Sequence, residues 1–172
     1  EKALLPFEKL PQPTITDVDL KVELFPHQRR AATTGSYRIE NRSGAPLQEV
    51  HLRWVRPLKM LRLDVPGATL EKAWNEFDYR IYRFDAPLQP GQSRTIAFAT
   101  ELHDPAFRND SRQHRLVDNG SFINNIEVSP LIGMSRQQLL QDRSKRRKQG
   151  LQPELRMASL DDPAASAHHY LR

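Results

Sequence analysis

The sequence contains no cysteine, which excludes disulfide bonds, thiolate metal sites and a cysteine nucleophile. It also contains no run of about 20 apolar residues, so we expect no membrane-spanning helix within it. Gly-x-Ser-x-Gly, His-Glu-x-x-His, phosphate-loop and dinucleotide-binding motifs are absent as well. We therefore expect no complete catalytic site and no metal site in this chain. Because it starts at Glu1 rather than methionine, we interpret it as a segment of a longer protein.

The composition is that of a folded domain. Hydrophobic residues make up 38% and charged residues 27% of the 172 residues, and 13 prolines against 7 glycines favour short, bounded elements. This length suits one domain of ordinary size with a tail.

Positive charge is concentrated in one segment. Residues 136–148 contain six basic residues and one acidic residue, which accounts for the whole net charge of +5. Because the excess positive charge is confined to this segment, it indicates one basic element rather than a basic surface. We therefore expect no nucleic-acid binding. Few aromatic residues lie beside it to stack on bases.

Alternation of apolar and polar residues begins at Ile15 and is typical of half-buried strands. Val18, Leu20, Val22 and Leu24 alternate with Asp19, Lys21 and Glu23. Further runs follow at 33–39, 47–54, 61–65, 70–74, 79–84 and 96–102, with one more strand at 121–128. The first two runs predict a hairpin. We predict a mainly β fold, a two-sheet antiparallel β-sandwich with one C-terminal basic helix.

The domain limits follow from these patterns. Residues 1–13, with three prolines, are a linker or lead-in, and residues 14–134 are the sandwich. The Ser135-x-x-Gln138 capping box predicts a basic helix in 135–150, from about 136 to 148, with Gly150 as its stop. We expect residues 151–172 to form an extended tail that leads to a missing downstream domain.

The histidines lack metal-ligand spacing, so we interpret His27, His51, His103 and His114 as surface or interface residues. Trp54 and Trp74 lie in strand patterns and are predicted to pack in the core rather than to bind a ligand.

Three strand and turn segments resemble a known family. Ile15–Leu24, Gly35–Asn41 and Pro87–Ser93 are similar to the opening strands of the amino-terminal, saddle-shaped β-sandwich of aminopeptidase-N-like zinc metallopeptidases. Asn119–Asn125, Pro130–Met134 and Asp142–Leu151 resemble the bacterial subgroup that is fused to ABC-transporter-type permease segments.

The resemblance implies a non-catalytic domain that packs on a downstream catalytic domain and shapes the access of peptide substrates. Zinc would bind in that downstream domain, and the parent protein would be extracytoplasmic, with membrane contact only through segments outside this chain. Typical members carry a glutamine that holds the substrate amine, and Phe122–Glu127 occupies its place without that motif. Asn124, Asn125 and Glu127 are the substitutes expected to face the substrate.

Two readings of the chain stay open. The basic side chains Arg143, Lys145, Arg146, Arg147 and Lys148 are expected to form a docking helix, but they also suit a solvated face or a phosphate or membrane surface. The alternative function is an extracytoplasmic binding module of a transporter-linked protein without hydrolytic activity. A His-Glu-x-x-His motif in the downstream chain would favour the peptidase.

Overall fold

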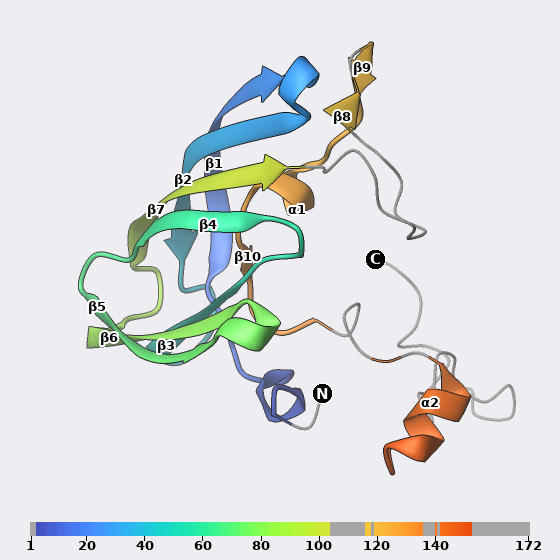
Figure 1. Cartoon of the computed structure of the whole chain (residues 1–172). Helices are drawn as coiled ribbons and strands as arrows, with labels where there is room; N and C mark the ends of the chain where they lie inside the picture. Colours follow the sequence, from blue (N-terminus) through green and yellow to red (C-terminus); the bar gives the residue numbers. More distant parts are fainter. Residues whose placement is uncertain (1–2, 104–115, 118, 136–139, 141, 153–172) are drawn as a thin grey trace, which may run out of the picture. The chain divides into compact units, whose positions relative to one another are not determined.

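The computed structural model describes residues 3–103, 116–117, 119–135, 140 and 142–152 (Figure 1). The chain divides into two compact units. One comprises Leu4–Met134 and contains every strand of the described part of the chain. The other comprises Glu1–Ala3 and Ser135–Arg172 and contains α2 (Arg143–Lys148).

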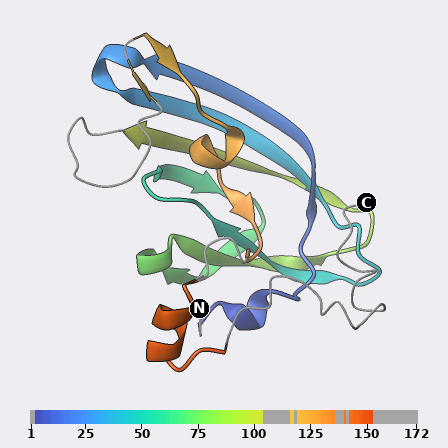
Figure 2. The same cartoon turned by 90° about the vertical axis from the view of Figure 1, so that its right-hand side faces the viewer.

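Two four-stranded antiparallel sheets make up the first unit, as predicted for a β-sandwich (Figure 2). The first sheet has the order β1 (Thr14–Phe25), β2 (Arg30–Glu40), β7 (Ser93–His103), β4 (Lys59–Asp64). The second has the order β10 (Leu131–Ile132), β3 (Leu47–Arg53), β6 (Tyr79–Leu88), β5 (Ala68–Trp74). The mainly β fold class is thereby confirmed.

Short elements join these strands. The 3-10 turns are η1 (Leu5–Phe7), η2 (Pro26–Gln28) and η3 (Asn75–Phe77), and β8 (Leu116–Val117) pairs with β9 (Gly120–Ser121). The β1–β2 hairpin is confirmed, and η2 with Arg29 in the left-handed region (φ 49°) connects its strands.

Alternating side chains of the two sheets form the core. Tyr37, Ile39, Ile96 and Phe98 of the first sheet pack with Val50, Leu52, Tyr82, Phe84 and Leu88 of the second. Strands β2 and β7 pair over their whole length, from Arg30 opposite His103 to Glu40 opposite Ser93. On β7, the inward-pointing side chains of Ile96 and Phe98 are fully buried.

The strand predicted at 121–128 is wrong over most of its length. Only Ser121 is in a strand, and residues 125–128 form the single helical turn α1 (Asn125–Val128). A local cap outweighs the extended pattern, because the Glu127 carboxylate accepts a hydrogen bond from the Asn124 N–H at 3.0 Å. Val128 then packs into a second apolar cluster with Ala31, Trp54, Leu58, Leu102 and Leu116.

The prediction of one continuous basic helix from about 136 to 148 is wrong, and its predicted start at 136 lies outside the described residues. Leu140 and Asp142 are not helical, and α2 begins at Arg143 with Asp142 as its N-cap, whose carboxylate accepts from the Lys145 N–H at 2.7 Å. An aspartate carboxylate is among the side chains that best cap a helix start. Gln138 lies outside the described residues. The predicted stop is confirmed, since Gly150 has a φ of 65° directly after the last turn.

Candidate functional site

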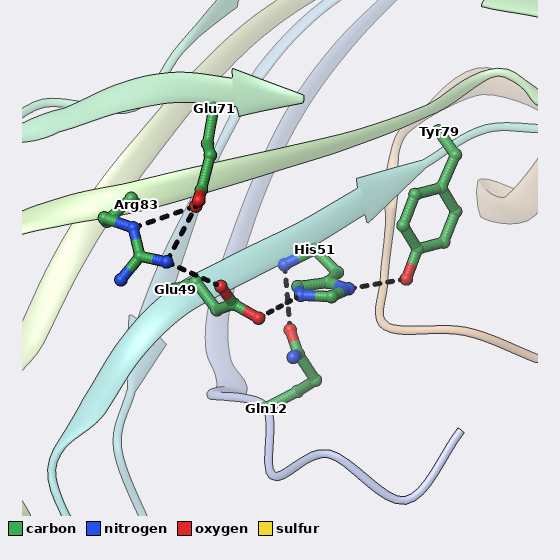
Figure 3. A network of polar contacts seen from close by, with 6 residues as sticks. All are labelled: Gln12, Glu49, His51, Glu71, Tyr79 and Arg83. Atoms are coloured by element: carbon green, nitrogen blue, oxygen red, sulfur yellow. Dashed lines mark hydrogen bonds and ion pairs between the residues drawn. The ribbon is translucent and has the colours of Figure 1, made fainter. Parts of the chain in front are cut away.

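A network of polar side chains lies on the outer face of the second sheet (Figure 3). We call it the His51 network, and its members are Gln12, Glu49, His51, Glu71, Tyr79 and Arg83. Glu49 and His51 alternate with the core residues Val50 and Leu52 along β3, so they point away from the sandwich core. Even so, His51 is 0% exposed. The prediction of a surface or interface histidine is therefore wrong for this residue.

Both ring nitrogens of His51 have partners. Nδ1 lies 2.7 Å from the Tyr79 hydroxyl and Nε2 lies 2.8 Å from Glu49 Oε1. Because a carboxylate only accepts, Nε2 carries a proton, and in a neutral ring Nδ1 accepts from the Tyr79 hydroxyl. Burial raises the pKa of Tyr79, which keeps its hydroxyl protonated and able to donate.

The network reaches solvent through Arg83. Its guanidinium donates two hydrogen bonds to Glu71, at 2.9 and 3.0 Å, and lies 3.9 Å from Glu49 Oε2. These hydrogen bonds lower the pKa of Glu71. A continuous line of polar contacts thus runs from buried Tyr79 to exposed Glu71.

The main chain of His51 joins the beginning and the end of the first unit. Its N–H donates to Gln12 Oε1 at 2.9 Å, and its carbonyl accepts from the Gly133 N–H at 2.9 Å. The carbonyl of Gly133 in turn accepts from buried Arg53 Nε at 2.9 Å, and burial lowers the pKa of Arg53. The strand β3 therefore fixes both the segment that enters the sandwich and the segment that leaves it.

Aromatic packing holds the entering segment in place. The ring of Phe7 lies 5.0 Å from that of His51, 5.9 Å from Trp74 and 6.3 Å from Tyr79, centroid to centroid. Residues 4–13, predicted as a lead-in, thus cover the outer face of the second sheet. Trp54 is buried in the second apolar cluster, which confirms its predicted core position, whereas Trp74 is only half-buried.

Replacing Gln12 with alanine should lower the free energy of unfolding by about 1–2 kcal/mol, because the His51 N–H would lose its acceptor. Chemical denaturation measures this, and hydrogen exchange should show faster exchange of the His51 amide. Gln48→Ala, at an exposed site on β3, the strand of His51, is the matched control and should change the stability by less than about 0.5 kcal/mol. Equal effects of the two variants would contradict the role given to Gln12.

The residues predicted to face the substrate lie together at α1. Asn124 and Asn125 are exposed, and Glu127 is half-buried. The Glu127 carboxylate caps α1, so it has a structural task that the sequence analysis did not assign to it. Two further bonds fix this turn to the first sheet, from Tyr37 Oη to Ser129 Oγ and from Thr100 Oγ1 to the Val128 carbonyl.

The residues predicted as a docking helix separate into two kinds. Arg143, Lys145, Arg147 and Lys148 are exposed. Arg146 is buried and donates to the carbonyls of Leu140, at 2.7 Å, and Gln152, at 2.8 Å. Arg146 therefore stabilises the chain around α2, and the four exposed side chains supply its basic surface.

Sequence reasoning missed the His51 network. The apolar residues Leu4, Leu5 and Phe7 in the lead-in were the available signal, because such residues need a surface to cover. No group of three or more potential metal ligands occurs among the residues that the structure describes. Across the same residues, every helix is too short or too polar to cross a bilayer.

The sequence matches no protein-family model, and no curated protein gives a significant match.

Proposed function

We propose that this chain is the non-catalytic, amino-terminal domain of a membrane-associated, zinc aminopeptidase-like protein. It packs on a downstream catalytic domain of the same chain and shapes the access of peptide substrates. Zinc and the chemistry of hydrolysis belong to that downstream domain. The parent lies outside the cytoplasm and is tethered through segments beyond this chain.

The proposal rests mainly on the position of residues 119–134, which contain the most distinctive part of the family resemblance. Residues 119–134 contribute α1, which is hydrogen-bonded to the first sheet, and β10, which pairs with β3 of the second. This segment therefore contacts both sheets and is an integral part of the sandwich. Its exit is fixed at Gly133, directly before the chain passes into the unit that contains α2.

Asn125 is the best candidate for contact with a substrate amine. An amide oxygen accepts hydrogen bonds from an ammonium group, and Asn125 is exposed on α1. Glu127 suits this role less well, because its carboxylate accepts from the Asn124 N–H.

The exposed basic residues of α2 suit docking onto an acidic surface of the downstream domain. Its one neighbouring acidic residue, Asp142, is used as the helix cap. Since Arg146 holds the adjacent main chain, these cations are presented on an ordered turn rather than on a free tail. Ordering reduces the entropy lost when a partner binds.

Deleting residues 14–134 from the parent should change kcat/KM by about tenfold or more for some peptides in a panel of different lengths. The reason is that the cleft would lose one wall. A milder variant, Arg143→Glu/Arg147→Glu, tests docking with the sandwich intact and should shift the peptide preference in the same direction. Assays with aminoacyl and peptidyl fluorogenic substrates measure both.

Single reversals at Arg143 and at Arg147 are compared with Arg62→Glu on β4, which changes the net charge by the same amount away from α2. Unchanged activity and unchanged peptide preference in both the deletion and the α2 variant would overturn the proposal. A parent that binds peptides but never hydrolyses them would establish the binding module instead.

A further inference from the structure

Strand β1 lies at an edge of the first sheet (Figure 2). It is 12 residues long, and within the described part of the chain its main chain pairs with β2 alone. The outer edge of such a strand presents N–H and C=O groups that can pair with a strand of another molecule. The length of β1 makes this edge a suitable template for pairing.

The apolar side chains of β1 are incompletely covered. Val22 and Leu24 are 39% and 46% exposed, although they lie opposite the buried residues Thr33 and Ala31 of β2. Leu20 is half-buried because it lies over Gly35, where a Cβ would come within 2.6 Å of Leu20 Cδ2. An additional strand beside β1 would cover Val22 and Leu24 and continue the apolar face of the sheet.

The sequence around Val22 is complementary to itself. In Leu20-Lys21-Val22-Glu23-Leu24, residues at equal distance from Val22 are either both leucine or of opposite charge. Lys21 and Glu23 are 74% and 54% exposed and lie on the opposite face of the strand from Val22. Two copies in antiparallel orientation would place each Lys21 opposite a Glu23 of the other copy.

We propose that β1 is a self-association surface, on which a second copy of this chain docks by antiparallel β1–β1 pairing centred on Val22. The twofold axis passes between the two Val22 residues, and the two first sheets become one continuous sheet of eight strands. Each Leu20 then lies opposite a Leu24, and two cross-strand ion pairs form.

Charge selects this register among its neighbours. A pairing centred on Lys21 would oppose two lysines, and one centred on Glu23 would oppose two glutamates. A pairing centred on Leu20 would place Asp17 opposite Glu23. If each residue instead paired one position further along the partner strand, apolar side chains would lie opposite charged ones. Among these registers, only the Val22-centred one pairs all of Leu20–Leu24 without such a conflict, and its one mismatch, Asp19 opposite Phe25, lies at the end of β1.

Reversing one charge tests the pairing. Lys21→Glu and Glu23→Lys should each weaken self-association of the full chain about tenfold. Because the complex is symmetric, either substitution turns both cross-strand ion pairs into pairs of like charge. The double variant Lys21→Glu/Glu23→Lys should restore it. An equimolar mixture of the two single variants should form a heterodimer more tightly than either variant pairs with itself.

Sedimentation velocity over a range of concentrations measures each association, with one variant carrying a fluorescent label in the mixture. Glu76→Lys, on η3, matches the charge change of Glu23→Lys away from β1 and should leave association unchanged. A chain that stays monomeric up to millimolar concentration overturns the proposal. Association that is insensitive to the single reversals, or that the double variant and the mixture fail to recover, overturns it equally.

Discussion

Replacing Phe98 with alanine should lower the free energy of unfolding by about 3–5 kcal/mol. Phe98 is 0% exposed in the middle of β7, and its ring lies 4.9 Å from that of Tyr37, centroid to centroid. In the sheet, Phe98 lies opposite Gly35 of β2 on one side and opposite Leu63 of β4 on the other. Truncation would open a cavity where three strands of the first sheet meet the second sheet.

Urea denaturation followed by circular dichroism measures this change. Phe122→Ala is the matched control, because Phe122 is the same residue type but 78% exposed, and its loss should alter the stability by less than about 0.5 kcal/mol. A similar effect of both substitutions would contradict the position of the core between the two sheets.

The sequence predicted the fold class because alternation is a local signal. Strand β7 shows the reason clearly, since every second residue from Ile96 to Leu102 is buried. Alternation does not reveal how deeply a strand lies in its sheet. Val18, Val22 and Leu24 have the same pattern and are exposed, because β1 is an edge strand.

The positions of irregularities in the sheets could not be predicted from the sequence for a similar reason. Leu61 and Leu63 look equivalent in the sequence, but a register shift between Met60 and Arg62 leaves Leu61 53% exposed while Leu63 packs on the core. A bulge of this kind adds one residue and reverses the side-chain alternation after it. Its position depends on pairing with β7, which no local pattern contains.

The candidate site could be predicted only in part. The exposed positions of Asn124 and Asn125 follow from their polarity, whereas the capping bond of Glu127 depends on α1, which was expected to be a strand. The His51 network joins residues 12, 51 and 79, and its bonds depend on which strands become neighbours. Because these partners are far apart in the sequence, the sequence analysis treated His51 as one of several scattered histidines.

Replacing His51 with alanine should destabilise the chain by about 3 kcal/mol. The Tyr79 hydroxyl would lose its buried partner, which costs about 1–3 kcal/mol, and the Phe7 ring would lose an edge contact. His103→Ala, at an exposed position that ends β7, is the control and should change the stability by less than about 0.5 kcal/mol.

A double-mutant cycle separates the hydrogen bond from the packing. Tyr79→Phe removes only the hydroxyl and should cost about 1 kcal/mol. Once His51 is alanine, that hydroxyl has lost its ring partner, so removing it should cost little or even stabilise the chain. The two changes together should therefore cost less than the sum of the single changes, by about 1 kcal/mol or more. Strict additivity would show that the 2.7 Å contact contributes no stability.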